Sequence, residues 1–516
     1  MARAASIIAA GNIVSRILGL ARDVAKSYFF GATGMVSAFN IAAKVPMWFY
    51  DLLAGGMVSA ALVPVFSTYA RREKRAELWL IASFLLTLCV ILMVPLILLG
   101  ELFAPQIAWL VSGGMSSEML HLTASLLRLT LPAMLFLNFA GILAGLLYSL
   151  KRFTLSAFNA AIFNLGIVAV TLLFAHPFGV RAMAVGLLIG AILQVVLQIP
   201  GLRDTHLRPV LNWRHPALPR IARLYVPIVV GLTVDMVSRA ISYRLASTTG
   251  DQSIAWMDYA TTLMQFPLGL TSTAVSIAIL PTLARQAVGW KLADDNQDFL
   301  ATLAHGLRLV LVLIIPATVG LFVLAKPVVA LIFEHGDFLP SDTAMTTMVL
   351  RLYLLGIIAA AIDLPLINAF YARQDAWTPA LVGLTGVFVY LAAALTPSLF
   401  RQMQLSDLII ANAIQLSFHA ITMWILLHRR IGSLRGLRLA YTSSRAILSA
   451  GAMAVLTIAA LWALGKIDWP NQILGELVIV VLPGAIGAAT YLTLMNAMKV
   501  PELGFVRQLM RIRNPL

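Results

Sequence analysis

The sequence contains little charge and almost no cysteine. Of its 516 residues only 11% are charged, whereas 60% are hydrophobic. Soluble proteins carry roughly 25% charged residues and about 45–50% apolar ones, so a water-soluble fold could not cover its surface with polar groups. This excludes the soluble enzyme classes. The one cysteine, Cys89, lies in an apolar stretch, so the chain forms no internal disulfide and no cysteine-based metal site.

Motifs for catalysis and nucleotide hydrolysis are also missing from the sequence. The eight histidines are scattered, and the chain has no His-Glu-x-x-His motif, no Walker loop and no Gly-rich dinucleotide fingerprint. We therefore expect no catalytic residues, no bound metal and no cofactor, and we predict that the protein is not an enzyme.

Long apolar stretches occupy most of the chain instead. A membrane-spanning helix needs about 20 mostly apolar residues. The sequence predicts an all-α polytopic membrane protein with about fourteen transmembrane helices, at roughly 5–29, 36–66, 77–101, 119–149, 155–175, 181–199, 222–247, 253–284, 300–324, 344–370, 378–399, 407–427, 441–464 and 472–497.

The net charge of +15 is distributed unevenly over the connections between these stretches. Lys and Arg gather in alternate connections, at 71–75, 151–152, 202–223, 285–291 and 429–438, and again in the C-terminal tail. Loops on the cytoplasmic side of a membrane protein collect such residues. We therefore predict cytoplasmic N- and C-termini, and we attribute most of the excess to topology. Nucleic acid is not an expected partner.

An internal repeat divides the chain. Val14-Ser15-Arg16 recurs 223 residues later as Val237-Ser238-Arg239, and Leu127-Arg128-Leu129 recurs at the same offset as Leu350-Arg351-Leu352. Each repeat contains six helices, so the second copy starts on the same side of the membrane as the first. This predicts two parallel six-helix lobes. The expected parts are an N-terminal lobe (1–201), a basic cytoplasmic linker (202–221), a C-terminal lobe (222–430), and helices 13 and 14 with a cytoplasmic tail (431–516).

Polar residues form stripes inside several predicted membrane helices. Asn12, Arg16, Asp23 and Lys26 share one face of the first helix, since they follow one another at helical spacing through Gly19. Further polar residues lie in the second helix, in the corresponding helices of the second lobe and in helix 10: Asn40, Lys44, Asp51, Asp235, Arg239, Arg244, Thr262, Gln265 and Asp363. Charge at bilayer depth is costly, so such residues point to function.

The chemistry of these stripes favours an anionic ligand. Arg16, Lys44 and Arg239 are cations within apolar helices, and guanidinium groups match phosphate geometry. Structural explanations exist for some residues: Asp235 and Arg239 could neutralise each other as i, i+4 partners, and Arg22 could reach the membrane interface. The prolines inside the helices permit bending. Together these features favour alternating access around a central cavity.

Several motifs resemble those of the MurJ (MviN) lipid II flippases, a family of the multidrug/oligosaccharidyl-lipid/polysaccharide exporter (MOP) superfamily. They extend over nearly the whole chain: Ser15 to Asp23 (SRILGLARD), Phe30-Gly31-Ala32, Lys44-x-Pro46, Val63-Pro64-x-Phe66, Tyr259-Ala260, Phe333-Glu334-x-Gly336-x-Phe338, Asp342-Thr343, Phe370 to Asp375 (FYARQD) and Thr378-Pro379. The resemblance implies fourteen helices in two six-helix lobes, and outward movement of undecaprenyl-pyrophosphate-linked peptidoglycan precursor. It also implies that helices 13 and 14 shape a groove for the lipid tail.

The resemblance implies roles for particular residues. Arg16, Arg22 and Lys44 correspond to cations of the family's cavity, and Arg244 falls near a basic position of helix 7. The polar stripes themselves make Asp23, Asp51, Asp235 and Asp363 candidates for gating or ion coupling. They also make Asn12, Asn40, Thr262 and Gln265 candidate polar residues of the cavity. The chain departs from the family where charges are usual, with Ser37, Tyr50-Asp51, Gly55, Thr262 and Gln265 in their places.

These departures leave alternatives open. The leading hypothesis is lipid II flipping for cell-wall synthesis in the bacterial cytoplasmic membrane, with energy from the membrane potential or from an H⁺ or Na⁺ gradient. The alternatives are export of another polyprenyl-linked saccharide, ion-coupled export of small amphiphiles, and a non-transporting membrane scaffold. The expected partners are the lipid-linked glycan, membrane lipids and cell-wall synthesis proteins.

Overall fold

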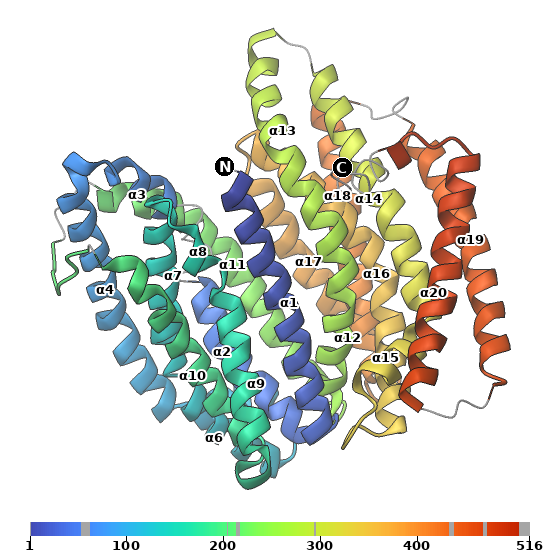
Figure 1. Cartoon of the computed structure of the whole chain (residues 1–516), viewed down its shortest axis with the longest axis horizontal. Coiled ribbons are helices and arrows are strands. Elements are labelled where there is room, and N and C mark those ends of the chain that lie inside the picture. Colours follow the sequence, from blue (N-terminus) through green and yellow to red (C-terminus); the bar gives the residue numbers. More distant parts are fainter. Residues whose placement is uncertain are drawn as a thin grey trace. The chain divides into compact units, whose positions relative to one another are not determined.

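The computed structural model describes residues 2–52, 62–203, 205–212, 217–293, 296–432, 438–467 and 472–504. These residues form twenty α-helices and contain no β-strand (Figure 1). The all-α membrane fold predicted from the composition is therefore confirmed.

The chain folds into two compact units. The first unit comprises Met1–Ala255 and His335–Leu339. Its helices are α1 (Ala2–Phe30), α2 (Gly34–Tyr50), α3 (Val63–Tyr69), α4 (Arg75–Leu102), α5 (Ala104–Ser112), α6 (Ser117–Thr130), α7 (Ala133–Ser149), α8 (Phe153–Ala157), α9 (Asn159–Phe178), α10 (Arg181–Gln198) and α11 (Ala217–Ser247).

The second unit comprises Trp256–Glu334 and Pro340–Leu516. Its helices are α12 (Ser253–Leu268), which begins three residues before the boundary, the π-helix η5 (Gly269–Thr273), α13 (Ala274–Ala293), α14 (Gln297–Val323), α15 (Ala325–Phe333), α16 (Pro340–Ala372), α17 (Trp377–Leu395), α18 (Leu405–Ile431), α19 (Leu439–Leu464) and α20 (Gln472–Ala497).

The compact units and the predicted lobes follow different criteria. Helix α11 lies in the first unit by its contacts, whereas the repeat assigns residues 222–247 to the second lobe. The lobe and linker boundaries depend on the sequence repeat alone and stay a prediction. Part of the predicted linker packs on α4, where the backbone N–H groups of Arg208 and Val210 donate to the hydroxyls of Ser83 and Thr87, each at 3.1 Å.

Two arginines at repeat-equivalent positions make the same contact in each unit. Arg128 Nε donates to the carbonyl of Glu101 at 3.2 Å, near the end of α4. Arg351 Nε donates to the carbonyl of Phe322 at 3.2 Å, near the end of α14. A cation at a helix C-terminus satisfies a carbonyl that has no partner within the helix. This shared geometry gives both arginines a structural role.

Nine helices of the described residues are long and apolar enough to cross a membrane, or eleven if each of two bent helix pairs forms one span. In its described residues, each of the fourteen predicted stretches falls on one helix or on consecutive helices. The count of fourteen spans itself stays a prediction. Large apolar side chains are exposed along these helices, such as Leu98 on α4 and Val455 on α19. Such surfaces are compatible with lipid rather than water.

Each bent pair contains a feature that interrupts helical hydrogen bonding. Pro132 separates α6 from α7, which meet at 41°. Helix α12 contains Pro267 and continues through the π-helix η5 into α13, also with a bend of 41°. Proline and π-turns are established causes of helix kinks. Both bends therefore follow from local sequence.

Candidate transport site

The polar face of α1 changes from exposed to buried along the helix. Asn12 and Arg16 are exposed, Arg22 is half-buried, and Asp23 and Lys26 are fully buried at 1% exposure each. The stripe predicted from helical spacing therefore contains two environments. Its first part is available to a ligand, and its second part is packed inside the first unit.

A network of charged and amide side chains surrounds the buried part of the stripe. Asp23 Oδ1 lies 3.0 Å from a guanidinium nitrogen of Arg22 and 3.3 Å from Lys26 Nζ. Arg22 also donates to Asn164 Oδ1 of α9 at 3.1 Å, and Lys26 to Asn40 Oδ1 of α2 at 3.4 Å. A buried ion needs a partner, and these contacts supply one for each charge. They also join α1 to α2 and α9. The transport roles of Arg22, Asp23 and Asn40 stay predictions.

A second charged cluster forms where α2 ends and α11 passes. Arg239 Nε pairs with Asp235 Oδ2 at 2.8 Å, and both side chains are more than half exposed. Asp51, directly after α2, lies within electrostatic range of Arg239, Asp235 and Lys44. The structure therefore brings four predicted residues together, two cations and two acids. An anionic ligand at Lys44 or Arg239 would compete with these acids.

An aromatic contact aligns the same two helices. The rings of Trp48 on α2 and Tyr243 on α11 lie 5.8 Å apart between centroids. Such a pair adds to the burial energy of its two helices. It keeps Asp51 and Arg239 in range of each other.

Arg244 lies apart from this cluster. Its guanidinium stacks 4.8 Å from the ring centroid of Trp109 and donates to that residue's carbonyl at 3.0 Å. The adjoining segments are also tied together, since Asp251 accepts hydrogen bonds from the backbone and hydroxyl of Ser116. The structure thus places Arg244 in the packing of α11 against α5. Contact between Arg244 and the ligand stays a prediction.

The second unit contributes the remaining predicted residues. Thr262 and Gln265 lie on α12, half-buried and exposed respectively. Asp363 on α16 lies 2.8 Å from Nδ1 of His419 on α18. His419 was not identified as a site residue from the sequence. The pattern that could have identified it is a lone histidine in the apolar stretch 407–427. Gly55, one of the departures from the family pattern, lies outside the described residues.

Charged residues also join α17 to α18 beside the connection 373–376. Asp375 accepts hydrogen bonds from the backbone and hydroxyl of Thr378, at 3.0 and 2.6 Å, and pairs with Arg430. Burial raises the pKa of Asp375, but these hydrogen bonds and the Arg430 charge outweigh burial, so the pKa lies below its ordinary value. The carboxylate stays ionised and binds the start of α17 to the end of α18.

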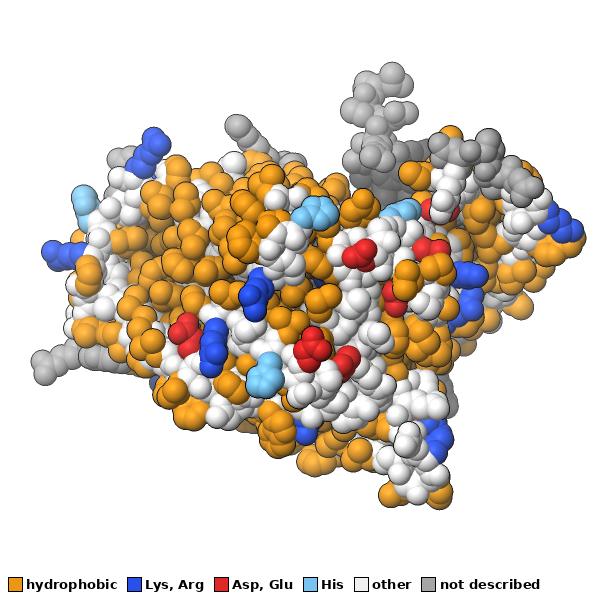
Figure 2. Space-filling model, turned by 90° about the horizontal axis from the view of Figure 1, so that it is seen from below, with side chains coloured by type: hydrophobic (Ala, Val, Ile, Leu, Met, Phe, Trp, Pro, Cys, Tyr) orange, Lys and Arg blue, Asp and Glu red, His pale blue; other side chains and the backbone are white. Residues whose placement is uncertain are grey.

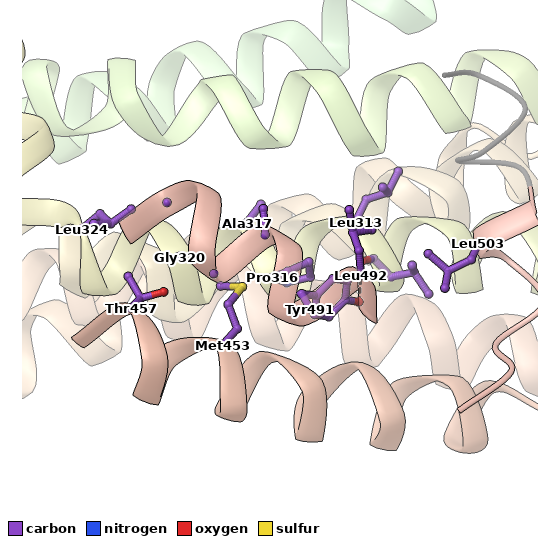
Figure 3. Close-up of a pocket in the computed structure, with 14 residues that line it drawn as sticks. Leu313, Pro316, Ala317, Gly320, Leu324, Met453, Thr457, Tyr491, Leu492 and Leu503 are labelled. Atoms are coloured by element: carbon purple, nitrogen blue, oxygen red, sulfur yellow. Dashed lines mark hydrogen bonds between the residues drawn. The ribbon is translucent and has the colours of Figure 1, made fainter. Parts of the chain in front are cut away.

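An apolar groove of about 340 Å³ lies in the second unit between α14, α19 and α20 (Figure 3). Met453 and Thr457 of α19 face Pro316, Ala317 and Gly320 of α14 across it, and Leu503 lies at one end. The Tyr491 hydroxyl donates to the carbonyl of Val312 at 2.8 Å, which satisfies that polar group. The groove fits hydrocarbon rather than a charged ligand.

On the face drawn in Figure 2, charged side chains are few and lie singly or in small groups among hydrophobic and uncharged polar ones. This distribution agrees with the charged fraction of 11%. Within the helices, the clusters described above pair acids with bases, because an unpaired ion in an apolar environment is costly.

Comparisons with known proteins cover most of the chain. Residues 26–479 match the family described as "Lipid II flippase MurJ". A "Probable lipid II flippase MurJ" of Haemophilus influenzae is 30% identical over 391 residues, which cover 72% of this chain and 76% of that protein. The "Lipid II flippase MurJ" of Burkholderia cenocepacia is 28% identical over 397 residues, with coverages of 75% and 76%.

Solved structures show the same fold. A "Lipid II flippase MurJ, inward closed conformation" superposes with a TM-score of 0.75 at 22% identity, covering 94% of this chain and 98% of that one. A multidrug resistance MATE family transporter of the MOP superfamily gives a TM-score of 0.66 at 15% identity, covering 82% and 95%.

Proposed function

This chain belongs to the lipid II flippase MurJ family, and we propose that it moves lipid II from the inner to the outer leaflet of the bacterial cytoplasmic membrane. Lipid II is the undecaprenyl-pyrophosphate-linked precursor of peptidoglycan. The observation that carries the proposal is the family match over residues 26–479. The protein acts as a transporter in cell-wall synthesis and not as an enzyme.

The pyrophosphate is assigned to cations of the first unit. Arg16 is exposed on α1, and Lys44 and Arg239 belong to the mixed cluster between α2 and α11. Guanidinium and ammonium groups bind phosphate through charge-assisted hydrogen bonds. A pyrophosphate at Lys44 and Arg239 competes with the ion pair between Arg239 and Asp235 and with the nearby charge of Asp51. The two acids thereby compete with the substrate and favour its release.

The prenyl chain is assigned to the apolar groove between α14, α19 and α20. Its lining is apolar apart from Thr457 and the bonded hydroxyl of Tyr491. Alternating access exposes the cationic site to each side in turn, and the helix breaks at Pro132 and at the π-helix η5 allow bending. Both termini face the cytoplasm in this scheme. Cell-wall synthesis proteins supply and consume the substrate.

Replacement of Arg16 tests the assignment of the head group. In cells depleted of the native protein, Arg16→Ala should lower lipid II delivery to the outer leaflet by roughly 10- to 100-fold, the equivalent of losing a charge-assisted hydrogen bond of about 1.5–3 kcal/mol. The measurement is lipid II accessible at the cell surface, normalised to protein in the membrane.

Arg71→Ala is the matched control, since Arg71 is exposed between α3 and α4. It should restore transport. Unchanged lipid II in the outer leaflet after depletion of the wild-type protein would contradict the proposed function. That outcome would favour another polyprenyl-linked saccharide as the substrate.

A further inference from the structure

A buried pair of an acid and an imidazole lies within two helices of the second unit. Asp363 Oδ2 and His419 Nδ1 are 2.8 Å apart, and the side chains are 14% and 15% exposed. Asp363 lies nine residues before the end of α16, about 13 Å along the helix axis. Both helices are apolar enough to span a membrane. The pair therefore lies at bilayer depth, where ionisable residues are costly, rare and in most cases functional.

Both ring nitrogens of His419 face hydrogen-bond acceptors. Nδ1 lies against the carboxylate of Asp363. The backbone carbonyl of Pro379 on α17 lies near the ring as a second acceptor, since proline has no backbone N–H to offer. Nε2 is the nitrogen directed at α17, because a Cβ on Gly383 would lie 4.0 Å from it. An imidazole can donate from both nitrogens only when it carries two protons.

We propose that Asp363 and His419 form a proton-binding site that couples transport to a proton gradient. The identity of the transported substrate rests on the proposed function, whereas the proton-binding site rests on the geometry of Asp363 and His419 alone. With the proton bound, the imidazolium donates to Asp363 and to Pro379, and the pair is neutral. When the proton leaves, one ring nitrogen presents a lone pair to an acceptor oxygen. The repulsion then favours separation of α18 from α16 or from α17.

The site lies beside a hinge in α16. Pro365 cannot donate a backbone hydrogen bond to Ala361, and that carbonyl instead accepts from the hydroxyl of Ser272 at 2.6 Å. Ser272 belongs to the π-helix η5. Asn368 adds a second link, from its side chain to the carbonyl of Ser276 on α13 at 3.3 Å. Movement at Asp363 is thereby transmitted to the bent helix pair that carries Thr262 and Gln265.

Among the described residues, the electrostatic partners of the pair are few. Tyr371, also on α16, lies within electrostatic range of Asp363, and α17 contributes the carbonyl of Pro379. The links to η5 and α13 involve only hydroxyl, amide and carbonyl groups. Of the charged residues on the neighbouring helices, Arg308 on α14 pairs with Glu502, and Glu334, directly after α15, accepts from Thr343 at the opposite end of α16.

Nitrogen NMR of histidine-labelled protein tests the site without any substrate. At neutral pH the wild-type protein should show a doubly protonated imidazole that disappears in His419→Gln, which assigns the signal. Asp363→Asn should convert that imidazole to the neutral form. His428→Gln is the control, because His428 is exposed near the end of the same helix. A neutral His419 in the wild-type protein would overturn the proposal, whether or not the protein transports lipid II.

Transport in proteoliposomes tests the coupling. With one proton exchanged per lipid II, a gradient of one pH unit should shift the steady-state distribution of lipid between leaflets by up to about tenfold. The ratio of this distribution with and without the gradient should fall towards one in Asp363→Asn and His419→Gln, and remain at the wild-type value in His428→Gln. A wild-type protein that flips lipid II but responds only to Na⁺ or to voltage would overturn the coupling. Absence of flipping with an intact NMR signature would instead contradict the proposed function alone.

Discussion

Asp23 illustrates how single charged residues are stabilised inside this protein. It is 1% exposed and lies between Arg22 and Lys26, one neighbour in sequence and one turn further along α1. Its carboxylate is the anion that balances a fully buried ammonium group. The exposed pair of Asp235 and Arg239 has the same chemistry but much less desolvation. The two pairs should therefore differ greatly in their contribution to stability.

Substitution of the two acids measures this difference. Asp23→Asn leaves Lys26 buried with an uncompensated charge, which costs about 3–5 kcal/mol. Asp235→Asn removes an exposed pair worth about 0–1 kcal/mol, less still after screening by solvent. The thermal unfolding midpoint in detergent should therefore fall strongly for the first variant and little for the second.

A double substitution separates charge from packing at Asp23. Asp23→Asn combined with Lys26→Met removes the unpaired charge and should recover part of the lost stability. Equal midpoints for Asp23→Asn and Asp235→Asn would contradict the burial argument.

At the scale of helices, the groove depends on small residues where α14, α19 and α20 meet. Gly320 on α14 borders the groove, and a Cβ there would lie 3.2 Å from the methyl group of Met453. A larger side chain at this position must extend into the groove. Gly451 on α19 offers a contrast, since a Cβ there meets nothing within 4 Å.

Gly320→Leu should therefore fill the groove and reduce transport of the long-chain substrate severalfold. A lipid II analogue with a short prenyl chain needs less of the groove and should be affected less. Gly451→Leu adds the same bulk outside the groove and should transport both lipids at the wild-type rate. The measurement is the ratio of long-chain to short-chain flipping in proteoliposomes, and an unchanged ratio in Gly320→Leu would exclude the groove as the site of the prenyl chain.

At the scale of the whole molecule, the orientation in the membrane follows from the basic connections. Cysteine labelling can test it directly, because the chain contains one cysteine, Cys89, and that residue is buried. In a Cys89→Ala background, a membrane-impermeant maleimide applied to intact cells should label Ser117→Cys and Ser341→Cys.

The same reagent should label Arg71→Cys and Gln374→Cys only after the cells are permeabilised. All four positions are exposed, so a failure to react reports the side of the membrane rather than burial. Labelling in the opposite pattern would reverse the predicted orientation of both termini.

The sequence by itself determined the membrane class, the helical fold and the polar face of α1. These properties depend on hydrophobic length and helical spacing, which are local features of the chain. The tertiary structure decided which polar residues are paired and which are exposed. Arg22 meets Asn164, 142 residues away, and Asp363 meets His419, 56 residues away. The apolar groove likewise joins three helices. No local pattern specifies such contacts, because they arise only when separate helices pack against one another.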